Sequence, residues 1–450
     1  MTQKLDTILI ANRGEIALRI IRACRELGIR TVLAFSQADR DSLPVRLADR
    51  AVCIGKPAAK TSYLNAQAIV GAALAYGCDG IHPGYGFLSE NADFAALCEE
   101  HGLVFIGPRS QTIRDMGDKI AARALAKAAG VPTTPGSDGA ISDRETAKAL
   151  ARDIGFPVLI KASAGGGGRG MRIVRRDEDL APFLMEAMSE ALAAFGNNSV
   201  YVEKYLENIR HVEVQVLGDG ERVIHLGERD CTTQRRNQKL VEEAPCVFIP
   251  EDTRAALGAA AVRLCEKVGY RSAGTVEFIY DQNTGAFYFI EMNTRIQVEH
   301  PVTELITGID LVKEQLRIAR GEPLRLRQED VRFGGHAIEC RINAEDHTAA
   351  FRPCPGRVER YAAPGGPGVR IDSHIEAGYA IPPYYDSMVA KLICWGRDRD
   401  EARQRVARAL QEMRIEGVTT TIPFHQSLIA HPAFVSGRFN TRFVHDVLGY

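Results

Sequence analysis

A run of acidic, amide and basic side chains follows a short apolar segment near residue 290, where residues 289–300 read FIEMNTRIQVEH. If a strand continues through Asn293, its two-residue period places Glu291 and Asn293 on one face. Carboxylate and amide oxygens suit Mg²⁺, and Glu277 lies on the segment expected to pair with this strand. The pattern favours a magnesium site over the alternative, a solvated polar face with a surface ion pair.

A glycine-rich segment at residues 163–170 (SAGGGGRG) directly follows an apolar segment that ends in Lys161. Glycine lets the backbone approach phosphate oxygens closely, and successive N–H groups form an anion-binding nest. The spacing matches neither G-x-x-x-x-G-K-[ST] nor G-x-G-x-x-G, so it is not a P-loop or a dinucleotide fingerprint. We expect a mobile lid that covers phosphates and excludes water; the alternative is a flexible hairpin turn.

Three further segments carry weaker signals. Residues 230–239 are polar and cationic without helical periodicity, so a solvated basic loop explains them as well as a site does. His211 and Glu213 alternate with valines on a half-buried strand, where a single histidine is more often structural. Residues 82–87 (HPGYGF) form a turn-rich loop after a strand, a position that lies at a crevice in open sheets.

These residues need elements to position them. Residues 8–11 and 31–36 read as strands separated by a helix over 15–27, and this unit recurs with strands at 51–54, 80–81 and 104–107. A crossover that contains a helix makes neighbouring strands parallel. We therefore expect an open, mostly parallel sheet up to about residue 115.

The rest of the chain reads as α+β. Strands are expected at 158–162, 171–174, 200–203, 212–216, 222–226, 275–280 and 286–292, and helices at 177–195 and 254–268. A third region begins near His336, where residues 338–342 alternate as a strand with one buried face does, and a helix covers 399–413.

Composition excludes several classes of protein. A chain of 450 residues is long enough for about three domains of ordinary size. Its content of 45% hydrophobic and 25% charged residues is ordinary for a globular protein with a buried core. The net charge of −1 is too small for the overall electrostatic potential of the protein to attract it to nucleic acid or to an anionic membrane. The 10 cysteines form no C-x-x-C and indicate reduced thiols. No segment is expected to span a bilayer, so we expect a cytoplasmic protein.

The chain closely resembles biotin carboxylases, members of the ATP-grasp superfamily. The resemblance lies in IANRGEIA at 10–17, HPGYGFLSEN at 82–91, RGM at 169–171, EKYL at 203–206 and EMNTRIQVE at 291–299. It runs from about residue 6 to residue 445 with the motifs in the family's order. It implies an α/β and α+β fold with three domains: an N-terminal Rossmann-like parallel-sheet domain (1–115), an ATP-grasp domain (116–335) with a mobile glycine-rich lid at about 132–204, and a C-terminal α+β domain (336–450).

The resemblance also implies site residues. The nucleotide site would comprise Lys119, Lys161, Gly167, Gly168, Glu203, Lys204, Tyr205, Leu206, His211, Asn237 and Glu277. The metal ligands would be Glu277, Glu291 and Asn293. Bicarbonate and biotin would bind Lys239, Arg295, Gln297, Val298, Arg341 and Asp386. The catalytic groups would be Arg295, Glu299, Lys239 and Arg341, with Glu299 as the base that deprotonates bicarbonate and Arg341 stabilising the enolate-like ureido oxygen of biotin.

The implied activity is ATP-dependent carboxylation of biotin by bicarbonate through carboxyphosphate, the first half-reaction of acetyl-CoA carboxylase in fatty acid synthesis. ATP, Mg²⁺ (or Mn²⁺) and carrier-bound biotin would take part. The acceptor of the whole enzyme stays open, because another acyl-CoA such as propionyl-CoA, a 2-oxoacid or urea would use the same half-reaction. A catalytically inactive ATP-binding scaffold and another ATP-grasp ligase are the alternatives from other classes.

We expect the biotin carboxyl carrier protein and the carboxyltransferase on separate chains, since the sequence has no Met-Lys-Met motif. The resemblance implies a homodimer and no nucleic-acid or membrane partner. Three residues depart from the family pattern. Asn237 stands where many relatives have histidine and cannot carry a charge near neutrality. Ala164 replaces one glycine and shortens the uninterrupted glycine run, and Cys354, to which we attach no function, stands where serine is common.

Overall fold

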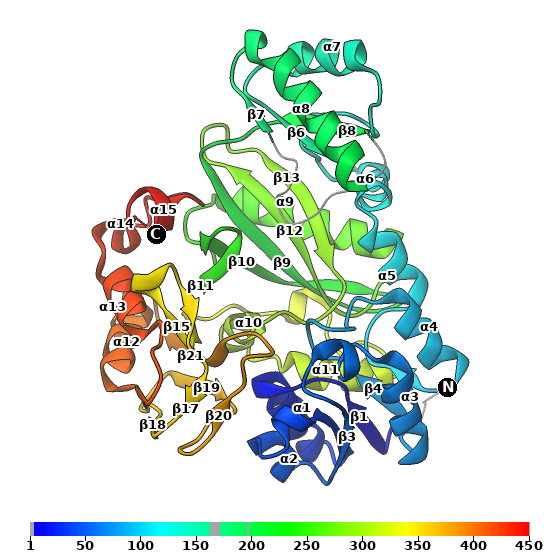
Figure 1. The fold of residues 1–450 in the computed structure, drawn as a ribbon, viewed down its shortest axis with the longest axis vertical. Helices are drawn as coiled ribbons and strands as arrows, with labels where there is room; N and C mark the ends of the chain where they lie inside the picture. The colour runs from blue at the N-terminus through cyan, green and yellow to red at the C-terminus, as the bar shows by residue number, and fades with distance from the viewer. Residues whose placement is uncertain (1–3, 163–171, 196–197, 450) are drawn as a thin grey trace.

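The computed structural model describes residues 4–162, 172–195 and 198–449 (Figure 1). Gly167 and Gly168, and with them the glycine-rich segment expected to form the lid, lie outside the described residues. All ten cysteines are free, as expected of reduced thiols. No helix in the described part of the chain is long and apolar enough to cross a membrane.

The N-terminal region is an open five-stranded sheet in the order β3-β2-β1-β4-β5, and every pairing is parallel. Its strands are β1 (Thr7–Ile10), β2 (Arg30–Ser36), β3 (Arg50–Gly55), β4 (Gly80–His82) and β5 (Val104–Phe105). The crossovers contain α1 (Gly14–Glu26), α2 (Leu43–Leu47), α3 (Ala66–Ala75) and α4 (Ala92–Glu100). The expected parallel sheet is therefore confirmed, because helical crossovers return the chain in the same direction.

A small lobe stands apart from the body of the molecule, at the top of Figure 1. It is an antiparallel sheet in the order β7-β6-β8, covered by two helices with a hydrophobic cluster of their own. The strands are β6 (Val158–Ala162), β7 (Arg172–Val174) and β8 (Val200–Lys204), and the helices are α7 (Arg144–Ile154) and α8 (Asp177–Phe195). The chain reaches this lobe through α5 (Ser110–Gly117) and α6 (Lys119–Ala128).

The body is an eight-stranded sheet in the order β13-β12-β9-β10-β11-β14-β21-β19 with antiparallel neighbours. Its strands are β9 (Ile209–Asp219), β10 (Val223–Arg235), β11 (Gln238–Ala244), β12 (Arg271–Asp281), β13 (Phe287–Asn293), β14 (His336–Asn343), β19 (Val369–Ser373) and β21 (Met388–Gly396). The pairing of β11 with β14 joins Val241 to Cys340. The strands on the two sides of residue 335 therefore share one sheet.

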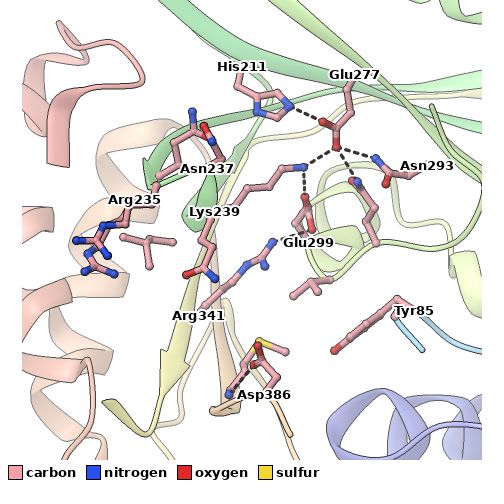
Figure 2. A pocket seen from close by; sticks show the side chains of 18 of the residues that line it. Tyr85, His211, Arg235, Asn237, Lys239, Glu277, Asn293, Glu299, Arg341 and Asp386 are labelled. Carbon is pink, nitrogen blue, oxygen red and sulfur yellow. Dashed lines mark hydrogen bonds and ion pairs between the residues drawn. The ribbon is translucent and has the colours of Figure 1, made fainter. Parts of the chain in front are cut away.

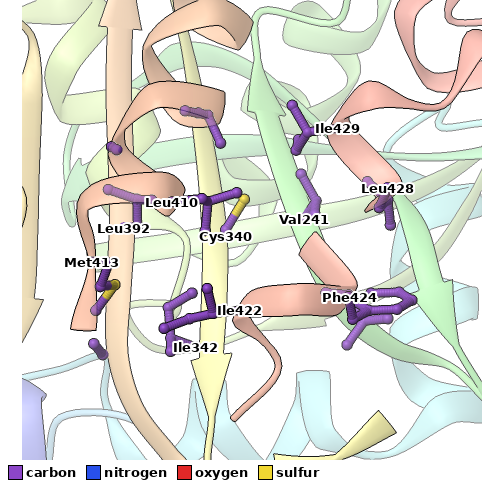
Figure 3. Packing of buried hydrophobic residues seen from close by; sticks show 14 of the residues in the cluster. Val241, Cys340, Ile342, Leu392, Leu410, Met413, Ile422, Phe424, Leu428 and Ile429 are labelled. Carbon is purple, nitrogen blue, oxygen red and sulfur yellow. The ribbon is translucent and has the colours of Figure 1, made fainter. Parts of the chain in front are cut away.

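Helices cover both faces of this sheet. On one face α12 (Arg399–Glu412) and α13 (Ile422–Ala430) pack over β14 and β21, where Ile342, Leu392 and Leu410 belong to one buried cluster (Figure 3). The other helices of the body are α9 (Glu251–Lys267), α10 (His300–Thr307), α11 (Leu311–Ala319), α14 (Pro432–Ser436) and α15 (Phe443–Asp446). Short strands complete the C-terminal part: β15 (Glu345–Asp346), β16 (Arg352–Pro353), β17 (Gly356–Arg357), β18 (Arg360–Ala362), β20 (Ala380–Ile381) and β22 (Arg414–Glu416).

One expectation about a strand is wrong, and one of two open alternatives is excluded. β14 does not have a single buried face, because α10 packs against the sheet here and Glu339, expected on a solvated face, is 0% exposed. Residues 230–239 do not form a loop: β10 continues through Arg235 and β11 starts at Gln238. Within 230–239, Asp230 and Lys239 form ion pairs, Thr232 and Thr233 are buried, and residues 236–238 are exposed. Polar side chains therefore occupy both faces, and the two-residue hydrophobic alternation that signals a strand is missing there.

The hairpin turn itself explains one residue type. Only Arg236 and Asn237 connect the paired residues Arg235 and Gln238, and their φ angles are 48° and 65°. Two positive φ angles in a two-residue hairpin match a type I′ turn, in which asparagine is favoured. Asn237 therefore has a conformational reason to occupy this position.

Candidate active site

A cleft of about 1020 Å³ is lined by residues from all three regions of the chain. The N-terminal loops at 12–15 and 85–87 line one part of it, and the β10–β11 hairpin, β12 and β13 line another. The loop at 295–299, residues 384–388, Arg341 on β14, and Lys119 and Lys161 also line it. Figure 2 shows Lys239 and Arg341 converging on Glu299 inside this cleft.

The expected oxygen ligands lie together on β12 and β13. β13 continues through Asn293, as predicted, and its register places Glu291 directly opposite Glu277. Asn293 Nδ2 donates to Glu277 Oε1 at 2.7 Å. Burial and the neighbouring charge of Glu277 raise the pKa of Glu291. Because a divalent cation between the two carboxylates would remove this repulsion, the donor set fits Mg²⁺.

Glu277 is also the acceptor for three other side chains. His211 Nε2 lies 2.7 Å from its Oε2, and Lys239 Nζ and Gln297 Nε2 each donate to its Oε1 at 2.9 Å. Burial alone would raise the pKa of Glu277, but Lys239 and His211 outweigh it and lower that pKa well below its ordinary value. Glu277 is therefore a fixed anion at neutral pH.

Lys239 is the centre of the charged cluster. Its Nζ lies 2.5 Å from Glu213 Oε2 and 2.8 Å from Glu299 Oε1, in addition to Glu277. Burial would lower the pKa of Lys239, but the surrounding carboxylates raise it well above its ordinary value. Glu213 in turn accepts from Arg229 Nε at 2.5 Å. Lys239 is therefore a permanently charged donor. A small anion that enters the cleft could take the place of one of its carboxylate partners.

Glu299 is 1% exposed and is held by two cations. Its Oε1 accepts from Lys239, and its Oε2 accepts from Arg341 Nη2 at 3.0 Å. Burial would raise the pKa of Glu299, but Lys239 and Arg341 outweigh it and lower the pKa below its ordinary value. Glu299 is therefore ionised and can accept a proton.

Arg341 is held by a second carboxylate that the sequence analysis did not identify. Its Nε donates to Glu242 Oε1 at 2.6 Å. Burial raises the pKa of Glu242 to about 7 even though Arg341 acts in the opposite direction. Glu242 lies directly opposite Glu339 across β11 and β14, and both are 0% exposed. Burial, more than any other effect, controls the charge of these groups.

The loop after β13 is fixed by side-chain contacts on both sides. Arg295 Nε donates to Glu90 Oε2 at 2.9 Å, and its Nη2 donates to Asn293 Oδ1 at 2.9 Å. Gln297 donates to Glu277 and accepts from Arg229 Nη2 at 3.0 Å. Arg295, Gln297 and Val298 all line the cleft.

The residues expected to bind nucleotide fall into two groups. Lys119, Lys161, His211, Asn237 and Glu277 line the cleft. Glu203, Lys204, Tyr205 and Leu206 do not, although Glu203 forms an ion pair with Lys161. Lys204 Nζ instead donates to the carbonyls of Gly155 and Phe156, both at 3.0 Å, so its charge stabilises the lobe.

Asp386 lies at the side of the cleft that faces away from β12 and β13 (Figure 2). Its Oδ1 accepts from the backbone N–H of Met388 at 2.8 Å. The residue is exposed and lines the same cleft as Arg341. The structure therefore brings it to the cleft without a contact to the charged cluster in the described residues.

Sequence reasoning missed the partners of the predicted groups. Glu213, Arg229 and Glu242 lie on β9, β10 and β11, and Glu90 comes from the loop after β4. Glu213 and Glu90 lie in segments that were noticed, but their roles as carboxylate partners depend on strand register and on the approach of distant loops. No local pattern marks a buried carboxylate as the partner of an arginine.

Comparisons with known proteins show the family to which the chain belongs. Residues 4–113 match the family model "Biotin carboxylase, N-terminal domain", residues 118–327 "Carbamoyl-phosphate synthase L chain, ATP binding domain", and residues 339–446 "Biotin carboxylase C-terminal domain". Biotin carboxylase 1 of Bacillus subtilis is 58% identical over 99% of this chain and 100% of its own length. The chain belongs to the biotin carboxylase family.

Relatives in this family are parts of carboxylases that act on different acceptors. A pyruvate carboxylase subunit of Methanothermobacter thermautotrophicus is 54% identical over 98% of this chain and 89% of its own length. The biotin carboxylase domain of the Hydrogenobacter thermophilus 2-oxoglutarate carboxylase is 53% identical, with a TM-score of 0.91 over 99% of this chain and 98% of that one. That structure is a dimer in complex with MgADP, ADP and bicarbonate. The match confirms the ATP-grasp fold expected from the biotin carboxylase resemblance.

Proposed function

We propose that this chain catalyses the ATP-dependent carboxylation of carrier-bound biotin by bicarbonate, through carboxyphosphate. The observation that carries the proposal is the convergence of Lys239, Glu299 and Arg341 beside the carboxylate pair Glu277 and Glu291 in one cleft. Membership of the biotin carboxylase family supports it over the full length of the chain. A scaffold that only binds nucleotide has no need for a buried base between two cations.

Bicarbonate would bind among Lys239, Arg295, Gln297 and Val298. Arginine offers a planar fork of donors that matches a small oxyanion, and lysine adds a point charge. An anion that accepts from Lys239 and Arg295 would also draw Lys239 away from Glu299. Because Lys239 contributes most to lowering the pKa of Glu299, this raises that pKa and makes Glu299 a stronger base toward the bicarbonate proton.

The proposed ligands of Mg²⁺ are Glu277, Glu291 and Asn293. The bound ion would neutralise negative charge on the phosphates during phosphoryl transfer. His211 holds one oxygen of Glu277 and helps to keep the carboxylate ionised, so its negative charge is present for a divalent cation. Lys119 and Lys161 line the cleft and provide positive charge for the phosphates. Gly167 and Gly168 are proposed to cover them.

Arg341 would stabilise the enolate-like oxygen of biotin. A fixed cation placed where negative charge develops contributes most to the transition state. Glu242 and Glu299 hold the guanidinium from two sides, so little reorganisation is needed when the charge appears. Asp386 lines the same cleft and is proposed to lie near the biotin ring.

The whole enzyme is proposed to be acetyl-CoA carboxylase, with the carrier and the carboxyltransferase as separate partners. Relatives named biotin carboxylase support this choice, whereas the pyruvate and 2-oxoglutarate carboxylase relatives favour a 2-oxoacid acceptor. We propose a homodimer, as in the dimeric biotin carboxylase domain of Hydrogenobacter thermophilus. The expected cytoplasmic location stays a prediction.

The purified chain tests the proposal directly. With Mg²⁺ present it should hydrolyse ATP only when bicarbonate is added, and free biotin should accelerate the release of ADP. Nucleotide binding without bicarbonate-dependent hydrolysis would identify a scaffold instead. The acceptor is then assigned by adding the carrier with acetyl-CoA or 2-oxoacid carboxyltransferases and measuring which product takes up labelled bicarbonate.

A further inference from the structure

A buried lysine lies directly behind the residues proposed to bind bicarbonate. Lys391 on β21 is 0% exposed, and its Nζ donates to the carbonyl oxygen of Val298 at 2.8 Å. Glu15 Oε1 lies 3.1 Å and Asp372 Oδ2 3.8 Å from the same nitrogen. Burying an ammonium group costs free energy even when it is paired, and an apolar side chain would fill the space at a lower desolvation cost. Packing alone therefore does not explain a lysine here.

Lys391 and Arg341 are neighbours across two strands. The register of β14 and β21 pairs them directly, so their side chains lie on the same face of the sheet. They contact successive residues of one loop. Lys391 donates to the Val298 carbonyl, and Arg341 donates to the Glu299 carboxylate, a pair that Figure 2 shows. Two cations on one pair of strands thus hold the backbone and the side chain of adjacent residues.

The contact at the Val298 carbonyl constrains an amide that lines the cleft. Val298 is a lining residue, and its N–H donates no hydrogen bond to the described residues. Gln297, which precedes it, is held by Glu277 and Arg229. The Val298 N–H shares its peptide plane with the Gln297 carbonyl, which accepts from the backbone N–H of His300 at 3.3 Å and lies 2.7 Å from His300 Nδ1. Lys391 holds the next peptide plane through the Val298 carbonyl, so both planes on either side of the Val298 Cα are held and its N–H keeps one direction.

The same lysine reaches a second side of the cleft. Glu15, its nearest carboxylate, accepts a hydrogen bond from the hydroxyl of Tyr85. Tyr85 lines the cleft from the N-terminal region. Lys391 therefore connects the loop after β13 with the N-terminal region through one buried carboxylate.

We propose that Lys391 is a positioning residue for bicarbonate: it fixes the Val298 backbone so that the Val298 N–H donates to the bound anion, and it does not itself touch substrate. This inference rests on the proposed function of the cleft. It assigns a role to a residue outside the cleft lining, and it predicts a defect in bicarbonate use without a defect in nucleotide binding.

Lys391→Met tests this, because methionine has a similar length but neither charge nor donor. In the full chain, the KM for bicarbonate in the ATPase assay should rise about tenfold or more, since a charged hydrogen bond is lost. The affinity for MgADP, measured by calorimetry, should stay within about twofold of the wild-type value. Asp372→Asn is the matched control, because it removes a charge beside Lys391 without contact to Val298; its KM for bicarbonate should stay within about threefold.

Two results would overturn the inference. A wild-type KM for bicarbonate in Lys391→Met shows that the contact does not position the anion. An equal rise in Asp372→Asn shows that the effect comes from the stability of the buried cluster. If Lys391→Met fails to bind MgADP and is unfolded, Lys391→Gln is measured by the same criteria. Failure of the wild-type chain to show bicarbonate-dependent hydrolysis would instead contradict the proposed function.

Discussion

At the scale of single residues, the cleft is a set of carboxylates whose charge depends on their cationic partners. Glu299 and Glu277 are buried yet ionised, because lysine, arginine and histidine side chains outweigh the cost of burial. Glu242 has a similar burial and only one such partner, and its pKa rises to about 7. Glu213 has two cationic partners, Arg229 and Lys239, and burial still raises its pKa. The balance of burial, cations and neighbouring carboxylates therefore sets the charge of each group.

Arg341→Ala should separate the two proposed partial reactions. Biotin carboxylation should fall by about 100-fold or more, because a fixed cation at the developing charge is lost. Bicarbonate-dependent ATP hydrolysis should fall by less than about tenfold, since Lys239 and Arg295 are retained. Parallel assays of both activities measure the ratio, with the exposed Arg408→Ala as control. Equal losses in both assays would contradict the role assigned to Arg341.

Glu291→Gln should depress both activities together. The neutral amide keeps the shape of the side chain but removes one of the two charges that face each other across β12 and β13. The Mg²⁺ concentration that gives half-maximal ATP hydrolysis should rise about tenfold. Glu412→Gln, on the surface of α12, is the matched control. An unchanged Mg²⁺ requirement would remove Glu291 from the proposed metal site.

At the scale of secondary-structure elements, the large sheet positions the cleft by register. β10 and β11 carry Arg229, Lys239 and Glu242, and the pairing of β11 with β14 brings Arg341 next to Glu242. The hairpin was open to interpretation as a loop because its buried side chains are polar. Its ion pairs compensate for that burial, and they connect the five adjacent strands β12, β9, β10, β11 and β14.

One ion pair attaches this hairpin to the helical layer. Glu243 on β11 accepts from Arg399 Nε at 2.6 Å and from Arg399 Nη2 at 2.9 Å, and His336 Nε2 lies 3.0 Å away. Arg399 also donates to the carbonyl of Phe434 at 2.9 Å. Burial would raise the pKa of Glu243, but Arg399 and His336 outweigh it and lower that pKa to about 2.

Glu243→Gln should therefore destabilise the protein by about 3 kcal/mol at pH 7, because it leaves the partly buried Arg399 with only neutral partners. The folded-state pKa lies below the ordinary value, so the wild-type carboxylate contributes stability above pH 4.5 and loses it as the pH falls toward 2. Urea unfolding at pH 7 and pH 3 measures this, and the difference between wild type and variant should shrink at pH 3. A difference independent of pH would contradict the ion-pair explanation.

At the scale of the whole molecule, one continuous sheet joins the metal-ligand strands to the strands that carry Arg341 and Lys391. The cluster beneath β14 and β21 supports both cations from the opposite face (Figure 3). The small lobe of β6–β8 has its own hydrophobic cluster and stands apart in Figure 1. The division into domains at residues 115 and 335 stays a prediction.

Leu392→Ala should test how much the hydrophobic cluster beneath β14 and β21 contributes to the free energy of unfolding. Leu392 is 0% exposed on β21, between Lys391 and Ile393. The cavity should lower the free energy of unfolding by about 2–5 kcal/mol. Leu74→Ala, at a side chain that is 46% exposed, should change it by less than about 0.5 kcal/mol. Denaturant unfolding gives both values, and similar stabilities for the two variants would contradict the packing argument.

The sequence by itself determined the parallel N-terminal sheet, the long helices near 15–27, 177–195, 254–268 and 399–413, and the pairing of Glu277 with Glu291, because these depend on local periodicity and on short connections. Its motifs also indicated the family. Only the tertiary structure decided that β10 and β11 are long strands, that Glu339 is buried, and that Glu242, Glu213 and Lys391 stand behind the predicted catalytic groups. Each of these depends on strands and loops far apart in the sequence, and the burial that sets their charges arises only when those segments pack together.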